Sequence, residues 1–145
     1  MIKVEVSVII HRPLTEVFAI LSNLENNMRW RTGMIAAQKI STGPIGVGTT
    51  YRMINSIFGR RIDGEAVVSE YELNQKYATV NKSGLPIETK RTFEPVNGGT
   101  KVTFAVKTEL RGFFNFAKPV LERIGKRRLE SDAAKAKALI EAGIL

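Results

Sequence analysis

Six strand-like segments follow one another between residues 35 and 110, with only short turns between them. They span residues 35–41, 49–57, 61–71, 77–83, 87–96 and 100–110, and the turns between them contain glycine, proline or asparagine. Antiparallel strands can be joined by such short turns, whereas parallel strands need a crossover of a dozen or more residues. The pattern therefore predicts an antiparallel meander.

A further strand is predicted at the N-terminus. Apolar residues occupy every second position from Ile2 to Ile10, which is the period of a strand with one buried face. Pro13 suits the first residue of a helix, and apolar residues at helical spacing extend that helix to Leu21. A second short helix or turn is expected to lead to Trp30.

The last segment, from about Phe113 to Ala142, is predicted to be one long helix. Its apolar stripe consists of Phe113, Phe116, Val120, Leu121, Ile124, Ala133, Ala134, Ala136, Ala138, Leu139 and Ile140. Pro119 falls inside the pattern, so a kink or break is expected there. The order of elements predicts an α+β fold in which a seven-stranded curved antiparallel sheet surrounds the C-terminal helix. The small alanines would leave space against the sheet, which predicts an apolar cavity.

The composition limits the kinds of site that the chain can form. The 145 residues contain no linker or low-complexity tract, so a single domain over 1–145 is expected. The chain has no cysteine, which excludes disulfides and thiolate metal sites, and its one histidine, His11, is expected to face solvent at a turn. No cluster of metal ligands is found, and no metal or cofactor is predicted. The chain lacks a long apolar run and an apolar N-terminus, so a cytoplasmic protein is expected.

The net charge of +8 raises the question of an anionic partner. The densest basic stretch is Lys126-Arg127-Arg128, which predicts a weak contact with anionic surfaces. Acidic residues interleave with the basic ones along this segment, namely Glu122, Glu130, Asp132 and Glu141. A solvated helix face is therefore favoured over a nucleic-acid site, unless folding gathers the cations on one side.

Arg91 is the most informative candidate site residue. It shares one strand face with Ile87, Thr89 and Phe93, so an inward orientation would bring a guanidinium into the interior. There it could pair with a ligand carboxylate, phenolate or phosphate. Two alternatives remain open: a bulge or register shift turns the side chain outward, or it pairs with a buried glutamate.

The other cavity candidates are aromatic, apolar or hydroxyl side chains on faces that would point inward. They are Trp30, Met34, Tyr51, Met53, Tyr77, Thr79, Phe93, Phe104, Phe113, Phe116 and Val120. Core packing is favoured over a cavity position for Trp30 and Phe116, and the strand faces of Tyr51 and Tyr77 suit either a partly wet cavity or an exposed surface. Glu65 and Glu70 are expected on opposite faces of their strand, so they form no carboxylate pair.

Several short motifs appear in a characteristic order. They are residues 6–25 (VSVIIHRPLTEVFAILSNLE), 28–30 (MRW), 46–51 (GVGTTY), 68–74 (VSEYELN) and 97–104 (NGGTKVTF). Their order and spacing resemble the START-like or SRPBCC superfamily, and in particular its polyketide cyclase/dehydrase and lipid transport branch. The resemblance implies a helix-grip cup that binds sterols, lipids, polyketides, plant hormones or quinone-like compounds, and some members are aromatases or cyclases.

Two functions follow as hypotheses. The first is non-enzymatic binding of a small hydrophobic molecule such as a lipid, polyketide or quinone-like compound. The alternative is a polyketide cyclase or dehydratase, which needs a proton-transfer group in the cavity. Only Arg91, Tyr51 and Tyr77 are available for that role, and no histidine or carboxylate is expected inside, so binding is favoured over catalysis.

Overall fold

The computed structural model describes residues 1–57, 59–109 and 118–145. These residues form seven strands, two α-helices and one 3-10 helix. In chain order they are β1 (Ile2–Ile10), α1 (Leu14–Leu21), η1 (Leu24–Arg29), β2 (Met34–Lys39), β3 (Thr50–Ile57), β4 (Arg60–Glu72), β5 (Lys76–Asn81), β6 (Ile87–Val96), β7 (Gly99–Thr108) and α2 (Lys118–Glu141).

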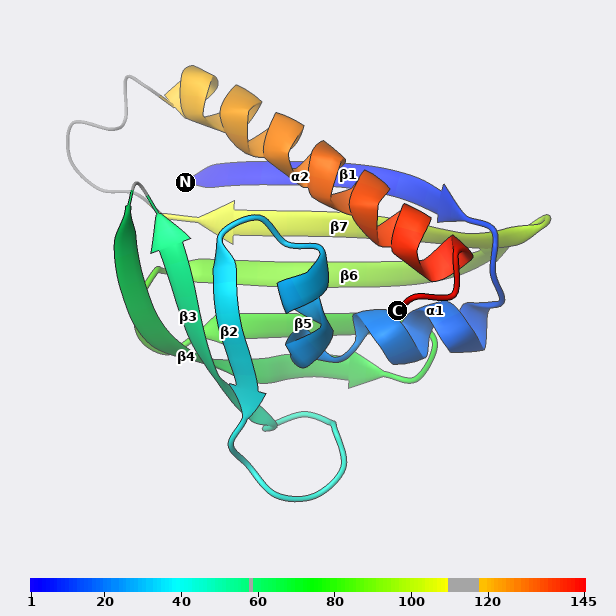
Figure 1. Cartoon of the computed structure of the whole chain (residues 1–145), viewed down its shortest axis with the longest axis horizontal. Helices are drawn as coiled ribbons and strands as arrows, with labels where there is room; N and C mark the ends of the chain where they lie inside the picture. Colours follow the sequence, from blue (N-terminus) through cyan, green and yellow to red (C-terminus); the bar gives the residue numbers. More distant parts are fainter. Residues whose placement is uncertain (58, 110–117) are drawn as a thin grey trace.

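The strands form one antiparallel sheet in the order β1-β7-β6-β5-β4-β3-β2. The first strand of the chain thus pairs with the last. Figure 1 shows the sheet twisting so that β2, β3 and the first part of β4 lie at a steep angle to β1, β7 and β6. Helix α2 crosses the sheet beside β1, and α1 and η1 lie on the same face. The predicted α+β helix-grip architecture is confirmed.

The predicted start of the first helix needs a small correction. Pro13 precedes α1 as its N-cap, with an extended ψ of 147°, and its carbonyl accepts the first helical bond from the Val17 amide. Pro119 is the second residue of the described part of α2, and the described helix continues from it to Glu141. Residues 113–117 of the predicted helix, including Phe113 and Phe116, lie outside the described residues.

Helix α2 packs through one side only. Leu129, Ala133, Ala136 and Ile140 are buried at spacings of three or four residues. The predicted stripe is therefore wrong in part, since its members Val120, Ile124, Ala134 and Ala138 are exposed. These residues lie on the opposite side of the helix, because an apolar list without a fixed phase mixes two faces of a cylinder.

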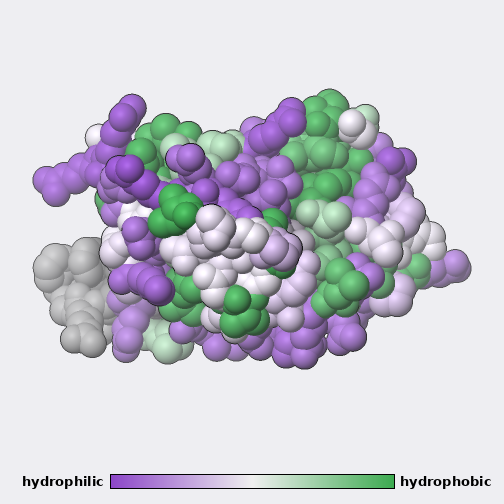
Figure 2. Space-filling view, turned by 90° about the horizontal axis from the view of Figure 1, so that it is seen from below, coloured by the Kyte–Doolittle hydropathy of each residue, from purple (hydrophilic) through white to green (hydrophobic). Residues whose placement is uncertain are grey.

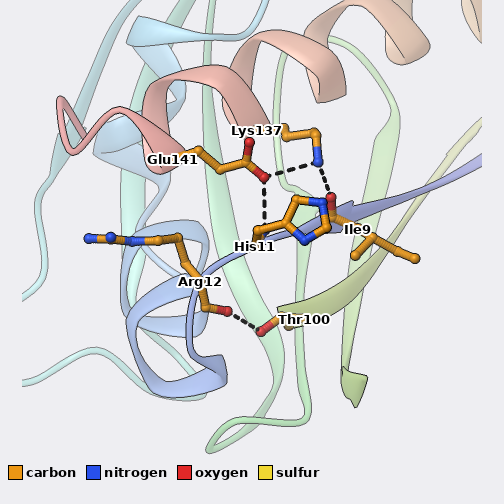
Figure 3. A network of polar contacts seen from close by, with 6 residues as sticks. All are labelled: Ile9, His11, Arg12, Thr100, Lys137 and Glu141. Carbon is orange, nitrogen blue, oxygen red and sulfur yellow. Dashed lines mark hydrogen bonds and ion pairs between the residues drawn. The ribbon is translucent and has the colours of Figure 1, made fainter. Parts of the chain in front are cut away.

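A polar network ties the end of α2 to the end of β1 (Figure 3). The Glu141 carboxylate accepts a hydrogen bond from the His11 main-chain N–H at 2.8 Å and one from Lys137 at 2.9 Å. The Lys137 ammonium also donates to the Ile9 carbonyl, and the Thr100 hydroxyl donates to the Arg12 carbonyl at 2.9 Å. The network fixes where α2 ends relative to β1 and β7. The His11 side chain is exposed, and its contribution here comes from the main chain.

Strand β4 contains a β-bulge between Val68 and Glu70. Val68 pairs with Thr79 and Glu70 pairs with Ala78, so Ser69 is the extra residue. The bulge reverses the alternation of faces along the strand. Glu70 therefore points outward, like Glu65, and bonds Lys76 and Lys90 at 3.2 and 3.4 Å. The expectation that the two glutamates lie on opposite faces is wrong for this reason.

Candidate ligand site

Arg91 occupies the middle of β6 with its side chain in the interior. Its register partners are Tyr77 on β5 and Phe104 on β7, and the pairing runs through them without a bulge. The residue is only 4% exposed, as is Phe93 two positions further along the same face. The alternative in which the strand turns Arg91 outward is therefore excluded.

The surroundings of Arg91 are aromatic rather than acidic. One of its guanidinium N–H groups donates to the Leu21 carbonyl at 2.7 Å. The guanidinium carbon lies 4.9 Å from the centroid of the Trp30 ring and 5.8 Å from that of Phe104. No carboxylate of the described residues forms an ion pair with it. Arg91 is thus a buried cation whose charge is balanced only by π faces and one carbonyl, which is a costly arrangement.

Four further buried polar atoms have no hydrogen-bond partner within the described part of the chain. They are Trp30 Nε1, the Tyr51 hydroxyl, the Tyr77 hydroxyl and Asn27 Oδ1. Trp30 and Tyr77 both contact the Arg91 guanidinium through their rings. The Leu24 amide at the start of η1 lies near both tyrosine hydroxyls, and Asn27 is one turn further along η1. Buried polar groups are nearly always paired, so a group of unpaired ones indicates a place for a further molecule.

Burial shifts the ionisation of this cluster. It raises the pKa of Tyr77 strongly, and the phenol of Tyr51 adds to the shift while Arg91 opposes it. Burial also raises the pKa of Tyr51. The two hydroxyls interact electrostatically without reaching hydrogen-bond geometry. Burial lowers the pKa of Arg91 to about 10, so the guanidinium remains charged at neutral pH. The cluster therefore presents one cation and two neutral phenols.

Asp132 on α2 is a second buried charge, and the sequence reasoning missed it. It is 2% exposed, so its assignment to a solvated helix face is wrong. Its carboxylate accepts from the Thr32 hydroxyl at 2.5 Å and from the Thr32 amide at 3.1 Å, with Arg31 at 4.0 Å. The contact clamps α2 to the segment after η1. Its position three residues after Leu129 and four before Ala136 is the signal that could have revealed it.

The other predicted site residues fall into four groups. Buried on the inner face of the sheet are Tyr51, Met53, Tyr77, Thr79, Phe93 and Phe104, and Trp30 is buried beside them at 1% exposure. Met34 is half-buried and packs against the core, and the Thr79 hydroxyl is paired with Thr89 at 2.6 Å. Val120 is exposed on α2 and does not join the cluster. Phe113 and Phe116 lie outside the described residues.

A groove of about 620 Å³ lies on the other face of the sheet, away from α2. Small residues such as Ala78 and Ala105 form its floor, and Lys3, Glu70 and Lys107 are among the charged residues around it. Its mixed polar lining does not match the apolar cavity predicted between sheet and helix. That cavity stays a prediction, because the Arg91 cluster is closely covered by side chains.

Residues 1–57, 59–109 and 118–145 contain neither a metal centre nor a membrane-spanning helix. No group of three or more histidine, aspartate or glutamate side chains there is arranged to hold a metal ion. No helix in these ranges combines the length and apolar character needed to cross a membrane.

The antiparallel seven-stranded sheet, the long C-terminal helix and the polar cluster beneath η1 define a START-like, Bet v 1-like helix-grip protein. The sequence matches the model of the family described as polyketide cyclase / dehydrase and lipid transport over residues 1–141, and the chain belongs to that family. No curated protein matches the sequence.

Solved structures share the fold at low sequence identity. TTHA0849 from Thermus thermophilus is 16% identical, with a TM-score of 0.81 and coverage of 97% of this chain and 98% of that one. A START superfamily protein from Mycobacterium smegmatis is 17% identical, with a TM-score of 0.78 and coverage of 98% and 96%. The Zhui aromatase/cyclase from Streptomyces sp. R1128 is 12% identical, with a TM-score of 0.73 and coverage of 99% and 95%.

Proposed function

We propose that the protein binds a small molecule with an apolar body and an acidic head group, and that the head group is held by Arg91 between the sheet and the helices. The observation that carries this proposal is the buried guanidinium, which has no carboxylate partner among the described residues, with Trp30 Nε1 and the tyrosine hydroxyls near it. Membership of a family whose description includes lipid transport supports an apolar ligand. The fold is compatible with many ligands, so the head group is argued from the site alone.

The chemistry of the cluster favours an acceptor over a donor. Arg91 and Trp30 can only donate hydrogen bonds, and neutral phenols donate readily. A carboxylate or enolate oxygen would accept from these groups and neutralise the buried charge. Phe93 and Phe104, beside Arg91 on the sheet, offer apolar surface for the rest of the molecule. A neutral apolar molecule would form no hydrogen bond with the guanidinium, so Arg91 would add nothing to its binding free energy.

The cost of burying these polar groups also favours a ligand with an acidic head group. A buried polar group left without a partner costs about 1–3 kcal/mol, and more when it is charged. A ligand that satisfies Arg91 and two or three of its neighbours recovers much of this cost on binding. The cluster is closely covered, so entry requires a local separation of η1 or α2 from the sheet. The Asp132–Thr32 contact joins α2 to the segment between η1 and β2, so movement of either one alone would break it.

A matched pair of probes tests the proposal. Fluorescence titration would compare dansyl-labelled undecanoic acid with its methyl ester, which has the same apolar body without the charge. The acid is expected to bind about tenfold tighter or more, as a charge-assisted hydrogen bond contributes about 1.5–3 kcal/mol. Arg91→Met should remove that difference, while Arg61→Met, at an exposed position of β4, should preserve it. Equal affinity for acid and ester in the unchanged protein would contradict an anionic head group.

The cyclase alternative uses the same cluster as proton donors. Neutral phenols beside a fixed cation could protonate or orient a carbonyl oxygen during ring closure. The likeness to an aromatase/cyclase structure supports this at the level of fold only. Incubation with a poly-β-keto thioester, followed by mass spectrometry, would detect cyclisation with loss of water. Product formation that disappears in Tyr77→Phe would favour the enzyme, and unchanged substrate would favour the carrier.

A further inference from the structure

The first turns of α2 expose apolar side chains that the fold does not use. Val120 and Ile124 are 59% and 57% exposed. They lie one turn apart, so their side chains share one side of the helix. That side is opposite the buried one, where Leu129 packs and Gly125 lies against Val4. Figure 1 shows the N-terminal turns of α2 at the edge of the molecule, with no other described element over them.

Basic side chains surround this apolar pair. Arg123 and Arg127 are exposed and, three residues after Val120 and Ile124 respectively, lie on the same side of the helix. We call Val120, Arg123, Ile124 and Arg127 the α2 outer face. The exposed basic residues of this half of the helix are Lys118, Arg123, Lys126, Arg127 and Arg128.

The one acidic residue in the same stretch is turned away from the outer face. Glu122 is the only carboxylate between Lys118 and Leu129, and its Oε2 accepts from the main-chain N–H of Lys3 at 3.4 Å. It therefore points toward β1. Over these turns the helix separates Glu122 from the arginines. The exposed Glu130, three residues after Arg127, borders the outer face at its C-terminal end.

We propose that the α2 outer face docks on the surface of a phospholipid bilayer that contains anionic lipids. Helices that lie on such surfaces combine an apolar strip with lysine or arginine, and their binding depends on both buried apolar area and charge. A nucleic acid would satisfy the arginines but would leave Val120 and Ile124 without an apolar environment, so the bilayer is the better match. Two apolar side chains give shallow and reversible docking. This surface is separate from the Arg91 cluster, and the proposal does not rest on ligand binding.

Other exposed apolar positions provide the controls. Val47 and Leu73 are each 69% exposed and lie outside α2. Figure 2 shows that hydrophobic residues on one face of the molecule form separate patches between hydrophilic ones. An effect that follows from apolar exposure in general would appear at these positions too. Arg60 and Arg61, exposed at the start of β4, provide a matched pair of arginines.

Cosedimentation with vesicles tests the proposal. The protein should bind vesicles of phosphatidylcholine with phosphatidylglycerol, should bind phosphatidylcholine vesicles weakly, and should be released by added salt. Arg123→Gln with Arg127→Gln should weaken binding about tenfold or more, at about 1 kcal/mol for each basic residue. Val120→Ser with Ile124→Ser should also weaken it. The pairs Arg60→Gln with Arg61→Gln and Val47→Ser with Leu73→Ser should have smaller effects.

Three results would overturn the proposal. One is equal binding to the neutral and anionic vesicles, or to neither. Another is unchanged vesicle binding by both outer-face variants, checked to be folded by circular dichroism. The third is binding to a DNA duplex that needs Arg123 and Arg127 but is unaffected by Val120→Ser with Ile124→Ser, which would assign the surface to nucleic acid.

Discussion

The guanidinium of Arg91 lies 4.9 Å from the centroid of the Trp30 ring, and both residues are almost inaccessible to solvent. The pair joins β6 to the residue that follows η1, and the Leu21 carbonyl at the end of α1 accepts the one hydrogen bond of the cation. Three elements therefore meet at a charge that no described carboxylate neutralises. Substitutions within and around this cluster distinguish a role in stability from a role in binding.

Replacing Arg91 by methionine is expected to leave the fold as stable as before or more stable. The change removes a buried cation, and apolar replacements of buried charges are often neutral or stabilising by about 1–4 kcal/mol. The loss of the hydrogen bond to Leu21 offsets part of this gain, by about 1 kcal/mol. Urea denaturation would measure the change. A loss of more than about 2 kcal/mol would instead give Arg91 a structural role.

Tyr77→Phe is expected to be neutral or to stabilise the protein by about 1 kcal/mol, because it removes a buried hydroxyl that has no partner among the described residues. The ring and its contacts with Tyr71 and Arg91 remain. The same variant should bind the dansyl acid more weakly if the hydroxyl donates to the head group. Thr79→Val is the matched comparison, since the Thr79 hydroxyl is paired with Thr89 and its removal should destabilise. Equal destabilisation by both changes would show that Tyr77 has a partner.

Asp132→Ala is expected to lower the free energy of unfolding by about 2–4 kcal/mol. The change leaves the Thr32 amide without its acceptor and removes the carboxylate next to Arg31. Asp132→Asn keeps one acceptor oxygen and should cost less. Glu130→Ala, on the exposed side of the same helix, controls for helix propensity and charge. Thermal denaturation that ranks Asp132→Ala beside Glu130→Ala would rule out the clamp.

Stability is expected to fall on the acid side because of Glu141. The His11 main-chain N–H and the Lys137 ammonium hold the pKa of Glu141 below its ordinary value of 4.5. A carboxylate with a lowered folded-state pKa stabilises the fold above its unfolded pKa, and this contribution is lost as pH falls through the folded value. The decline should therefore begin near pH 4.5, the ordinary value, and continue below it.

Glu141→Gln isolates this contribution. The variant should be less stable near neutral pH and should show a flatter decline on acidification, measured by urea denaturation at a series of pH values. Glu130→Gln serves as the control. An acid decline in Glu141→Gln as steep as that of the unchanged protein would mean that other carboxylates account for it.

The strands and the inward position of Arg91 could be predicted because alternation is clean where the sheet is regular. In β6 the pairing runs without a shift, so the side of Arg91 and Phe93 follows from counting by two. The count fails in β4, where the bulge moves Glu70 to the outer face. No residue type in that stretch of the sequence indicates that Ser69 is an extra residue in the strand. Local pattern thus predicts the face of a strand only as long as its register holds.

Helical positions were harder to place. The stripe on α2 mixed buried residues such as Ala136 with exposed ones such as Val120, because the sheet covers one side of the helix and Val120 lies on the other. Asp132 was recoverable from its spacing to Leu129. Asn27 was not, since η1 is a short 3-10 helix with no apolar period that assigns its faces. Long-range packing, which local pattern does not contain, decided these positions.

The bulge in β4 also limits how the chain can vary in length. Before it, Ala66 and Val68 point inward, and after it Tyr71 does, where its ring meets Phe18 at 5.5 Å. Deleting Ser69 would remove the bulge and leave Val68, Glu70 and Tyr71 in simple alternation, with Glu70 outside and Tyr71 inside as now. A one-residue deletion elsewhere in β4 would instead exchange the two faces of the strand beyond it. Ser69 is therefore a position at which β4 can change in length by one residue and keep its faces.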